Sequence, residues 1–356
     1  RAFMGFYEML ARSHIQFDIV DEYNVKNGSI SKYDLVILPT CGCIFDETAE
    51  GIKNYVQSGG NIISTYDTGF YTQKGQYAKR GLLWDVQGIE EYQDTIEYTI
   101  SGTGYQCLKK DHWCSESFDS MLIPSPTLAV KAVPSSKAEV VSTYLEPMRG
   151  RYVALPSEGY PGMIINQYGK GCSFYIAGTI GEYYCEKSHP ALRRLVENIV
   201  RKLSSRVLSS DTLCSVEFVL RSQEIENVHA LEERGKDKCR SIVNSEGESK
   251  GEESCKCSNN KRYILHVINM TGDMKRPVEK IAPLFDVSVT LNLDIKASAI
   301  KKISAATGTL DTVINAGNGS NNIKNDCGNN LAFIQTDNEI KIAIPRIEEY
   351  EVIVIE

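Results

Sequence analysis

The chain has 356 residues and a formal net charge of −7; 42% of its residues are hydrophobic, 24% are charged and 11 are cysteines. This length predicts two or three domains, and the composition excludes collagen, coiled coil and wholesale disorder. No apolar run approaches the ~18 residues of a membrane span. The acidic balance argues against nucleic acid and anionic membrane as partners, because both are bound through clustered Lys and Arg. The odd, scattered cysteines favour a reducing compartment, and we expect a cytoplasmic protein.

The first two hundred residues have the pattern of an α/β domain. Residues 2–12 place apolar side chains at helical spacing, and Ile15–Val20 predicts a short strand. Tyr33–Pro39 is continuously apolar, which is typical of a strand buried on both faces of a parallel sheet. Asp46 is expected to cap a helix that runs through Val56, and Asn61–Tyr66 is the next strand. Such a strand–helix–strand unit demands a parallel pair.

Strand and turn signals dominate the middle region, 90–180. Met163–Tyr168 and Cys172–Ala177 flank a glycine-containing turn and predict a hairpin. Pro190–Leu203 then carries apolar side chains on one helical face, with His189 at its start, and predicts a helix. We therefore expect a flavodoxin-like α/β domain over residues 1–205.

The remainder, residues 206–356, predicts an all-β antiparallel sandwich, because short strands alternate with turns and no helix interrupts them. Residues 204–211 are polar and predict a linker. The expected strands are Val216–Arg221, Tyr263–Asn269, Val287–Leu293, Ala332–Thr336, Ile340–Ile344 and Tyr350–Ile355. Residues 224–262 are highly charged with almost no aromatic side chains, so we expect a disordered insertion between two strands.

The predicted sheet lacks one strand. A doubly wound domain opens with a central strand followed by a helix, whereas this chain opens with the helix at residues 2–12. The missing strand would lie between Ile15–Val20 and Tyr33–Pro39, and an empty slot there would leave backbone groups unpaired. We expect that the chain is the C-terminal part of a longer polypeptide, or that another segment fills the slot.

Several segments resemble one known family. Tyr33–Pro39, Asp46–Gly60 and Ile62–Gly69 resemble the trimerisation domain of family 42 β-galactosidases, a class I glutamine amidotransferase-like module. Ile264–Thr271 and Ile344–Ile355 resemble the terminal β-sandwich of related hypothetical glycoside hydrolases.

The resemblance implies an accessory and oligomerisation region. In such proteins the catalytic carboxylates lie in an N-terminal (β/α)8 barrel, for which this chain has no room and no eightfold pattern. The implied protein is a homo-oligomer, with a trimer favoured, whose carbohydrate substrate is handled by the missing barrel. No catalytic residue and no cofactor is expected in this chain, and whether it has any enzymatic role of its own is left open.

The residues after the second predicted strand show whether the chain has the catalytic cysteine of an amidotransferase. A working enzyme needs a Cys on a strained turn that follows this strand. Tyr66, Asp67 and Thr68 stand there instead, and Cys41 follows the preceding strand. We interpret Cys41 mainly as a small apolar filler of its loop.

Two rival functions stay open. Cys41, Asp67, Thr68 and Tyr71 could line a small-molecule or sugar pocket at the strand ends, with a hydrolase activity of its own. The predicted sandwich could bind carbohydrate, although residues 206–356 contain no Trp to form a stacking platform.

The charged insertion contains possible zinc ligands. Cys239, Cys255 and Cys257, with His229 upstream, could hold a tetrahedral ion. Their spacing matches no standard zinc knuckle, so solvent-exposed thiols are the favoured interpretation.

Overall fold

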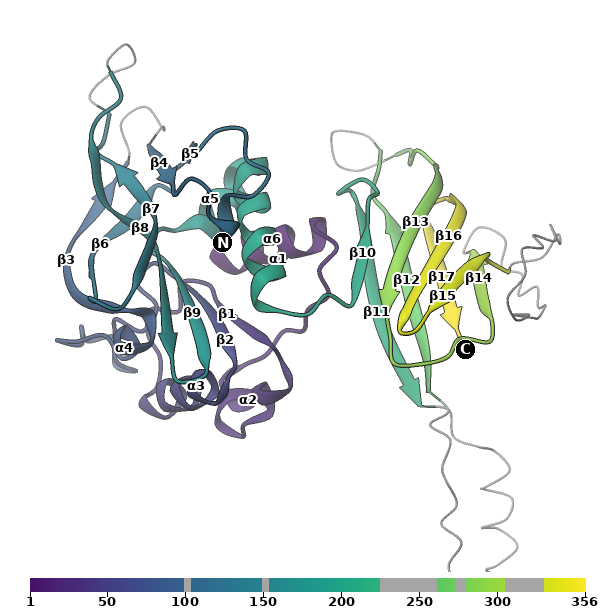
Figure 1. Ribbon diagram of the computed structural model, residues 1–356, viewed down its shortest axis with the longest axis horizontal. Coiled ribbons are helices and arrows are strands. Elements are labelled where there is room, and N and C mark those ends of the chain that lie inside the picture. Colours follow the sequence, from purple (N-terminus) through teal and green to yellow (C-terminus); the bar gives the residue numbers. More distant parts are fainter. Residues whose placement is uncertain (99–103, 149–153, 225–260, 273–278, 305–329) are drawn as a thin grey trace, which may run out of the picture. The chain divides into compact units, whose positions relative to one another are not determined.

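The computed structural model describes residues 1–98, 104–148, 154–224, 261–272, 279–304 and 330–356 (Figure 1). It separates into two compact units, Arg1–Arg206 and Val207–Glu356, here called unit 1 and unit 2.

Unit 1 is built on a seven-stranded mixed sheet. Three neighbouring strands at one end run parallel, and the others pair antiparallel. In spatial order the strands are β1 (Leu35–Leu38), β2 (Asn61–Thr65), β9 (Gly171–Ile176), β8 (Glu158–Tyr168), β7 (Glu139–Leu145), β4 (Tyr105–Leu108) and β5 (Leu122–Pro124). The predicted parallel pair and the predicted hairpin, which is β8–β9, are both confirmed.

Helices cover both faces of this sheet. One face packs against α1 (Ala2–Arg12), α5 (Ile180–Lys187) and α6 (Pro190–Leu203), which lie beside one another (Figure 1). The other face packs against α3 (Asp46–Ser58). The remaining elements of unit 1 are α2 (Glu22–Lys26), η1 (Ser29–Lys32), α4 (Trp84–Gln87), η2 (Trp113–Ser115) and a separate antiparallel pair formed by β3 (Ile89–Glu97) and β6 (Leu128–Pro134).

Local sequence signals explain the helix ends. α6 begins as predicted, because Pro190 occupies the first turn and the His189 Nδ1 accepts the N–H of Ala191. α3 ends at Gly59, whose φ of 124° suits a residue without a Cβ. Asp46 does not cap α3; Phe45 is the N-cap and Asp46 lies in the first turn, where its charge still favours the helix dipole.

The predicted strand at Ile15–Val20 is wrong. Residues 15–20 form no regular structure, and the sheet ends at β1. A strand exists only where a neighbouring strand pairs with its backbone, and none of the sheets in the described residues includes residues 15–20. β1 is therefore an edge strand, with its apolar residues only partly buried apart from Val36, and not the interior strand that its sequence indicates.

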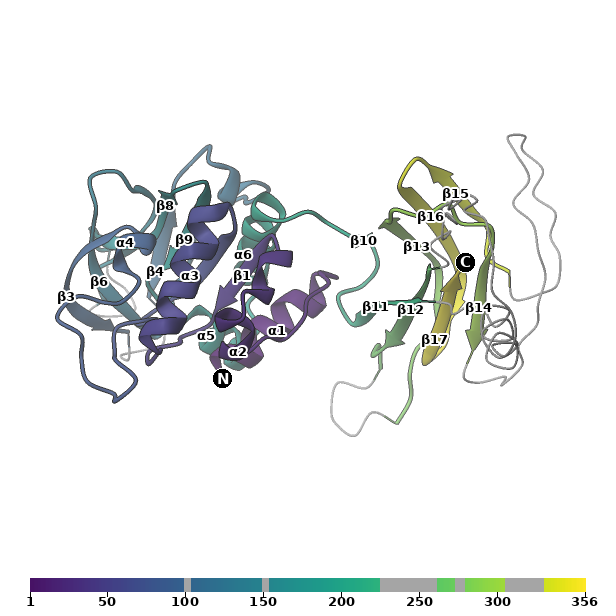
Figure 2. The ribbon, with the colours of Figure 1, turned by 90° about the horizontal axis from the view of Figure 1, so that it is seen from below.

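Unit 2 contains strands and no helix among its described residues (Figure 2). Two four-stranded antiparallel sheets share one hydrophobic core, which is the predicted sandwich. One sheet has the order β10 (Leu208–Ser210), β13 (Leu284–Asn292), β16 (Glu339–Ile347) and β15 (Phe333–Thr336); the other has β11 (Val216–Glu224), β12 (Lys261–Asn269), β17 (Tyr350–Ile355) and β14 (Ile300–Ser304).

Two strands of unit 2 were not predicted. β10 lies inside the segment predicted as a linker, and β14 was absent from the expected strands. Both are short, and their apolar residues Leu208 and Ile300 become buried only through the pairing with distant strands. The predicted insertion, with Cys239, Cys255 and Cys257, falls on residues that lie outside the described ranges.

Candidate functional site

The carboxyl ends of β1 and β2 bring two loops together. The Gly69 N–H donates to the Cys41 carbonyl at 2.9 Å, and the Tyr71 N–H donates to the Gly42 carbonyl at 3.0 Å. Cys41, Asp67, Thr68 and Tyr71, which the sequence analysis selected, therefore lie on adjoining loops at one edge of the sheet. We call this region the carboxyl-edge cluster.

The residue directly after β2 has the backbone of a strained turn. Tyr66 has a φ of 52°, in the left-handed region that side chains other than glycine rarely adopt. Its N–H donates to the Ile176 carbonyl at 2.9 Å, and its carbonyl accepts from the Tyr175 hydroxyl at 2.6 Å. This turn therefore presents a phenol where an amidotransferase needs a thiol, and burial raises the pKa of that phenol.

Thr68 and Cys41 have structural roles in the cluster. The fully buried Thr68 hydroxyl donates to the Thr65 carbonyl at 2.7 Å and accepts the Cys41 N–H at 3.1 Å. Burial, with smaller effects from the charges of Glu22 and Asp67, raises the pKa of the Cys41 thiol to about 11. Since the thiolate is the nucleophilic form, this raised pKa disfavours Cys41 as a nucleophile at neutral pH.

Asp67 has a buried carboxylate oxygen without a partner among the described residues. Its Oδ1 atom is buried and accepts no hydrogen bond from them. Burial raises the pKa of the carboxyl group, its own backbone N–H lowers it, and the charge of Glu182 adds a smaller increase. An orphaned buried acceptor costs stability, so it is the feature of this edge that a hydrogen-bonding ligand would satisfy.

Tyrosine rings lie on the same edge. The Tyr71 and Tyr77 ring centroids are 6.1 Å apart, and those of Tyr77 and Tyr92 are 5.9 Å apart. Tyr77 is 47% exposed, so part of this aromatic surface faces solvent. Tyr77 and Tyr92 are not among the site residues predicted from the sequence, because no local pattern places Tyr92 of β3 beside these loops.

A cysteine and a histidine do meet elsewhere in unit 1. The His112 Nδ1 lies 2.9 Å from the Cys114 Sγ and also accepts the Cys114 N–H, while the His112 Nε2 lies 3.9 Å from a Glu139 oxygen. Cys114 is fully buried, and burial raises the pKa of its thiol to about 12. Burial also lowers the pKa of His112. Cys114, His112 and Glu139 follow one another in the order thiol, imidazole and carboxylate, as in a catalytic triad. The thiol, however, is buried and its pKa is raised.

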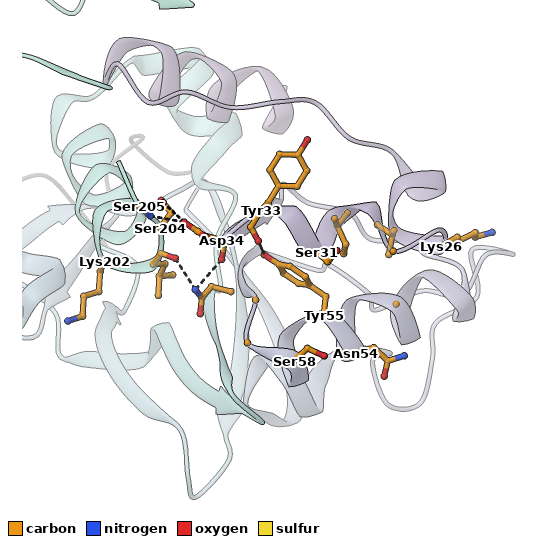
Figure 3. Close-up of a pocket in the computed structure, with 18 residues that line it drawn as sticks. Lys26, Ser31, Tyr33, Asp34, Asn54, Tyr55, Ser58, Lys202, Ser204 and Ser205 are labelled. Atoms are coloured by element: carbon orange, nitrogen blue, oxygen red, sulfur yellow. Dashed lines mark hydrogen bonds between the residues drawn. The ribbon is translucent and has the colours of Figure 1, made fainter. Parts of the chain in front are cut away.

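A cavity of about 710 Å³ lies at the opposite, amino ends of β1 and β2 (Figure 3). Several of its polar groups bind one another. The Tyr55 hydroxyl donates to the Tyr33 carbonyl at 2.8 Å, and the Asn61 amide donates to the carbonyls of Asp34 and Leu203. Ser205 donates to Asp34 through its hydroxyl and its backbone N–H, which lowers the pKa of that carboxyl. These bonds join α3, β2, the residues just before β1 and the end of α6, so this part of the cavity wall stabilises the fold.

Two further features bear on the class of protein. Over the described ranges, no group of three or more His, Cys, Asp or Glu side chains is placed to hold a metal ion. None of the described helices has both the length and the hydropathy needed to cross a membrane.

The fold defines an α/β unit that is joined in sequence to a β-sandwich, and burial raises the pKa of the thiol in the carboxyl-edge cluster of that unit. Residues 2–205 match the family model of the β-galactosidase trimerisation domain. Because this match covers more than half of the chain, the chain belongs to that family.

Two curated relatives are similar to part of the chain. The chain is 23% identical over 214 residues to β-galactosidase LacA of Lactobacillus acidophilus, which covers 59% of this chain and 27% of that protein. It is 24% identical over 186 residues to β-galactosidase BgaP of Planococcus sp. strain L4, which covers 49% of this chain and 24% of that protein. The chain thus spans about a quarter of the length of these relatives.

Two solved structures share the fold over almost the whole chain. An α-L-fucosidase isoenzyme 2 from Paenibacillus thiaminolyticus has a TM-score of 0.62 at 17% identity. The match covers 99% of this chain and 44% of the fucosidase chain. A β-galactosidase from Bacillus circulans sp. alkalophilus has a TM-score of 0.56 at 16% identity. The match covers 99% of this chain and 37% of that β-galactosidase chain. At these identities the likeness shows the fold alone.

Proposed function

We propose that this chain is the accessory and oligomerisation region of a glycoside-hydrolase-like protein whose catalytic barrel lies upstream in the parent polypeptide. Unit 1 is an amidotransferase-like, flavodoxin-like domain that has no nucleophile and contributes to a homo-oligomer, with a trimer favoured. The carbohydrate substrate is bound by the barrel. The parent protein acts in the cytoplasm, in keeping with the free thiols of the described cysteines.

One observation carries this proposal. The strained turn after β2, where an amidotransferase would activate a cysteine, holds Tyr66 with a φ of 52°. The nearest thiol in the cluster, Cys41, has a pKa raised to about 11. The family match to a trimerisation domain supports a role in assembly for a domain that keeps this turn but not its chemistry.

The oligomeric state of the parent protein tests the proposal. Size-exclusion chromatography with light scattering is expected to give a trimer for the parent protein. It should give a smaller species for a version that lacks unit 1. A monomeric parent, or a trimer that persists without unit 1, contradicts the assembly role.

A second candidate function is a hydrolase pocket at the carboxyl-edge cluster. The buried Asp67 Oδ1 without a partner among the described residues favours it, because a ligand hydroxyl could donate to that atom. Asp67→Asn would then abolish a turnover that Cys43→Ser, at an exposed position of the adjoining loop after β1, leaves unchanged. The variants are made in chain 1–356, which lacks the proposed barrel, and equal turnover of nitrophenyl glycosides by both variants and by unmodified chain 1–356 excludes this function.

A further inference from the structure

The two sheets of unit 2 differ in the side chains that they turn away from the core. In an antiparallel sandwich the inward residues are apolar and the outward residues between them are normally polar. β16 follows this rule, since Lys341 and Ala343 are exposed between buried isoleucines. The residues paired with them on β13, Thr290 and Ser288, are polar as well. The middle of this sheet therefore presents an ordinary solvent face.

The other sheet is apolar on both faces. Its inward residues, such as Leu265, Val267 and Ile353, belong to the core of unit 2, so the residues between them point outward. The outward residues are also apolar: Val219 of β11, Ile264 and Ile268 of β12, Tyr350, Val352 and Val354 of β17, and Ile303 of β14. Each is partly exposed, and none is among the residues that form the core of the unit or pack against it. We call these residues, together with His266, the outer apolar band.

Strand pairing makes the outer apolar band continuous. A middle row of directly paired residues crosses all four strands and contains Val219, His266, Val352 and Ile303. A row on one side pairs Ile268 with Tyr350, and a row on the other side pairs Ile264 with Val354. The Nδ1 of His266 and the Tyr350 hydroxyl are hydrogen-bonded at 2.5 Å, so these polar atoms already have partners if the band is covered.

Charged and polar side chains border the band at one end. Arg262 donates to Gln223 at 2.8 Å, and Glu356 lies 3.8 Å from Arg262 and 2.9 Å from Lys301. An apolar centre with a charged rim is the usual anatomy of a protein–protein interface, whereas a sheet face meant for solvent carries polar residues in its centre. The band is therefore a contact surface for another protein surface.

We propose that the outer apolar band of unit 2 binds the same band of a second copy of this chain, face to face about a two-fold axis. The axis lies along the middle row, so Val352 of one copy faces Val352 of the other. This contact does not depend on the assembly role proposed for unit 1. Where unit 1 forms a trimer, the two-fold contact pairs two trimers.

The charges on β11 support a second copy in this orientation. Glu217 lies in the row on one side of the middle row, and Arg221 lies in the row on the other side. Rotation about the middle row brings Glu217 of each copy opposite Arg221 of the other, so two opposite-charge pairs form. Rotation about an axis along the strands would instead bring Arg221 opposite Lys301, which has the same charge.

The size of the band suits weak self-association. With strands about 4.8 Å apart and alternate residues about 6.8 Å apart, four strands and four rows, the rim included, cover about 500 Å² of each copy. The total of about 1,000 Å² is at the lower end of what a specific interface needs. We therefore expect pairing at micromolar protein concentrations and separation on dilution.

Sedimentation equilibrium of chain 1–356 over about 1 to about 200 µM tests the proposal, because such a weak interface forms within this range. The mass is expected to double as the concentration rises. Val352→Lys should weaken this pairing at least about 100-fold, because it sets two positive charges against each other. Ala343→Lys, on the outward face of the other sheet, is the matched control and should pair like the unmodified chain.

The doubling is counted from the smallest species, whether that is a monomer or a trimer, so a failure of the trimer proposed for unit 1 leaves this test intact. No doubling in the unmodified chain overturns the proposal. A doubling that Val352→Lys leaves unchanged shows pairing through another surface and also overturns it.

Charge reversal at the rim tests the orientation with variants that leave the apolar centre intact. Glu217→Arg should weaken pairing about 10-fold, and Arg221→Glu in the same chain should restore it to within about 3-fold. The two residues lie four positions apart on one strand, about 14 Å, so a restoration reports a contact between copies and not within one. Pairing that the second substitution fails to restore overturns the proposed two-fold arrangement.

Discussion

At the scale of single residues, the carboxyl-edge cluster shows how burial removes reactivity. Asp67 and Cys41 both keep the polar atoms that catalysis requires, yet burial is the first cause of the raised pKa of each group. A buried acid with a raised pKa favours its neutral form, and a buried thiol with a raised pKa is protonated at neutral pH. The same physics acts on Cys114 beside His112.

Asp67→Asn is expected to raise the free energy of unfolding at pH 7 by up to about 1 kcal/mol, because the side chain is partly exposed and the effect is screened. The sign follows from the raised pKa. The folded state holds the Asp67 proton more tightly than the unfolded state, so stability is highest below the ordinary pKa and falls as pH rises from there to the folded value. Urea unfolding of both proteins at pH 4, 5 and 7 measures this difference. The exposed Asp119→Asn is the control, and a loss of stability in Asp67→Asn at pH 7 would contradict the prediction.

The thiols are expected to differ strongly in their rates of alkylation. With pKa values of about 11 and about 12, Cys41 and Cys114 carry roughly one thousandth and one ten-thousandth of thiolate at pH 8. Both should react with iodoacetamide at least about 100-fold more slowly than the exposed Cys43 of the native chain. Mass spectrometry of timed samples measures the rates, and rapid labelling of Cys41 would show an activated thiol.

At the scale of elements, unit 1 depends on close contacts that the helices make through small residues. α1 crosses α5 where Gly5 meets Gly181, and a Cβ at Gly5 would lie 1.8 Å from the Gly181 carbonyl oxygen. That oxygen belongs to the backbone and cannot turn aside as a side chain could. The crossing therefore fixes where α1 begins relative to the sheet.

Gly5→Ala is expected to destabilise the chain by about 3 kcal/mol, because α1 and α5 must move apart. Gly51→Ala in α3 is the matched control. Its Cβ would meet the Val25 Cγ1 at 2.8 Å, but alanine also improves the helix by about 0.5–1 kcal/mol, so a net change within about 1 kcal/mol is expected. Thermal unfolding followed by circular dichroism compares the two, and equal losses would show that the crossing has no special role.

At the scale of the whole molecule, no hydrophobic core cluster of the described residues contains residues from both sides of the boundary after Arg206. Three core clusters of the described residues lie entirely in unit 1, and the fourth lies entirely in unit 2. Each unit thus has its own apolar interior, which is the condition for folding as a separate domain.

We therefore expect two heat-absorption peaks when the chain is unfolded in a scanning calorimeter. A separate piece of residues 207–356 should reproduce one of them within about 5 °C, because no core residue described here is lost with unit 1. A single cooperative peak in the intact chain, or a piece that shows no transition, would contradict independent units.

Periodicity determined α1, α3 and α6, since a helix is set by residues three and four positions apart, and it also determined β1, β2 and the β8–β9 hairpin. The absence of a cysteine after β2 is equally visible in the sequence. Only the tertiary structure decided that residues 15–20 form no strand and that the Asp67 Oδ1 has no partner among the described residues. The reason is that strand pairing and burial depend on residues far away in the chain. A local sequence pattern does not indicate whether those distant residues pack beside the segment.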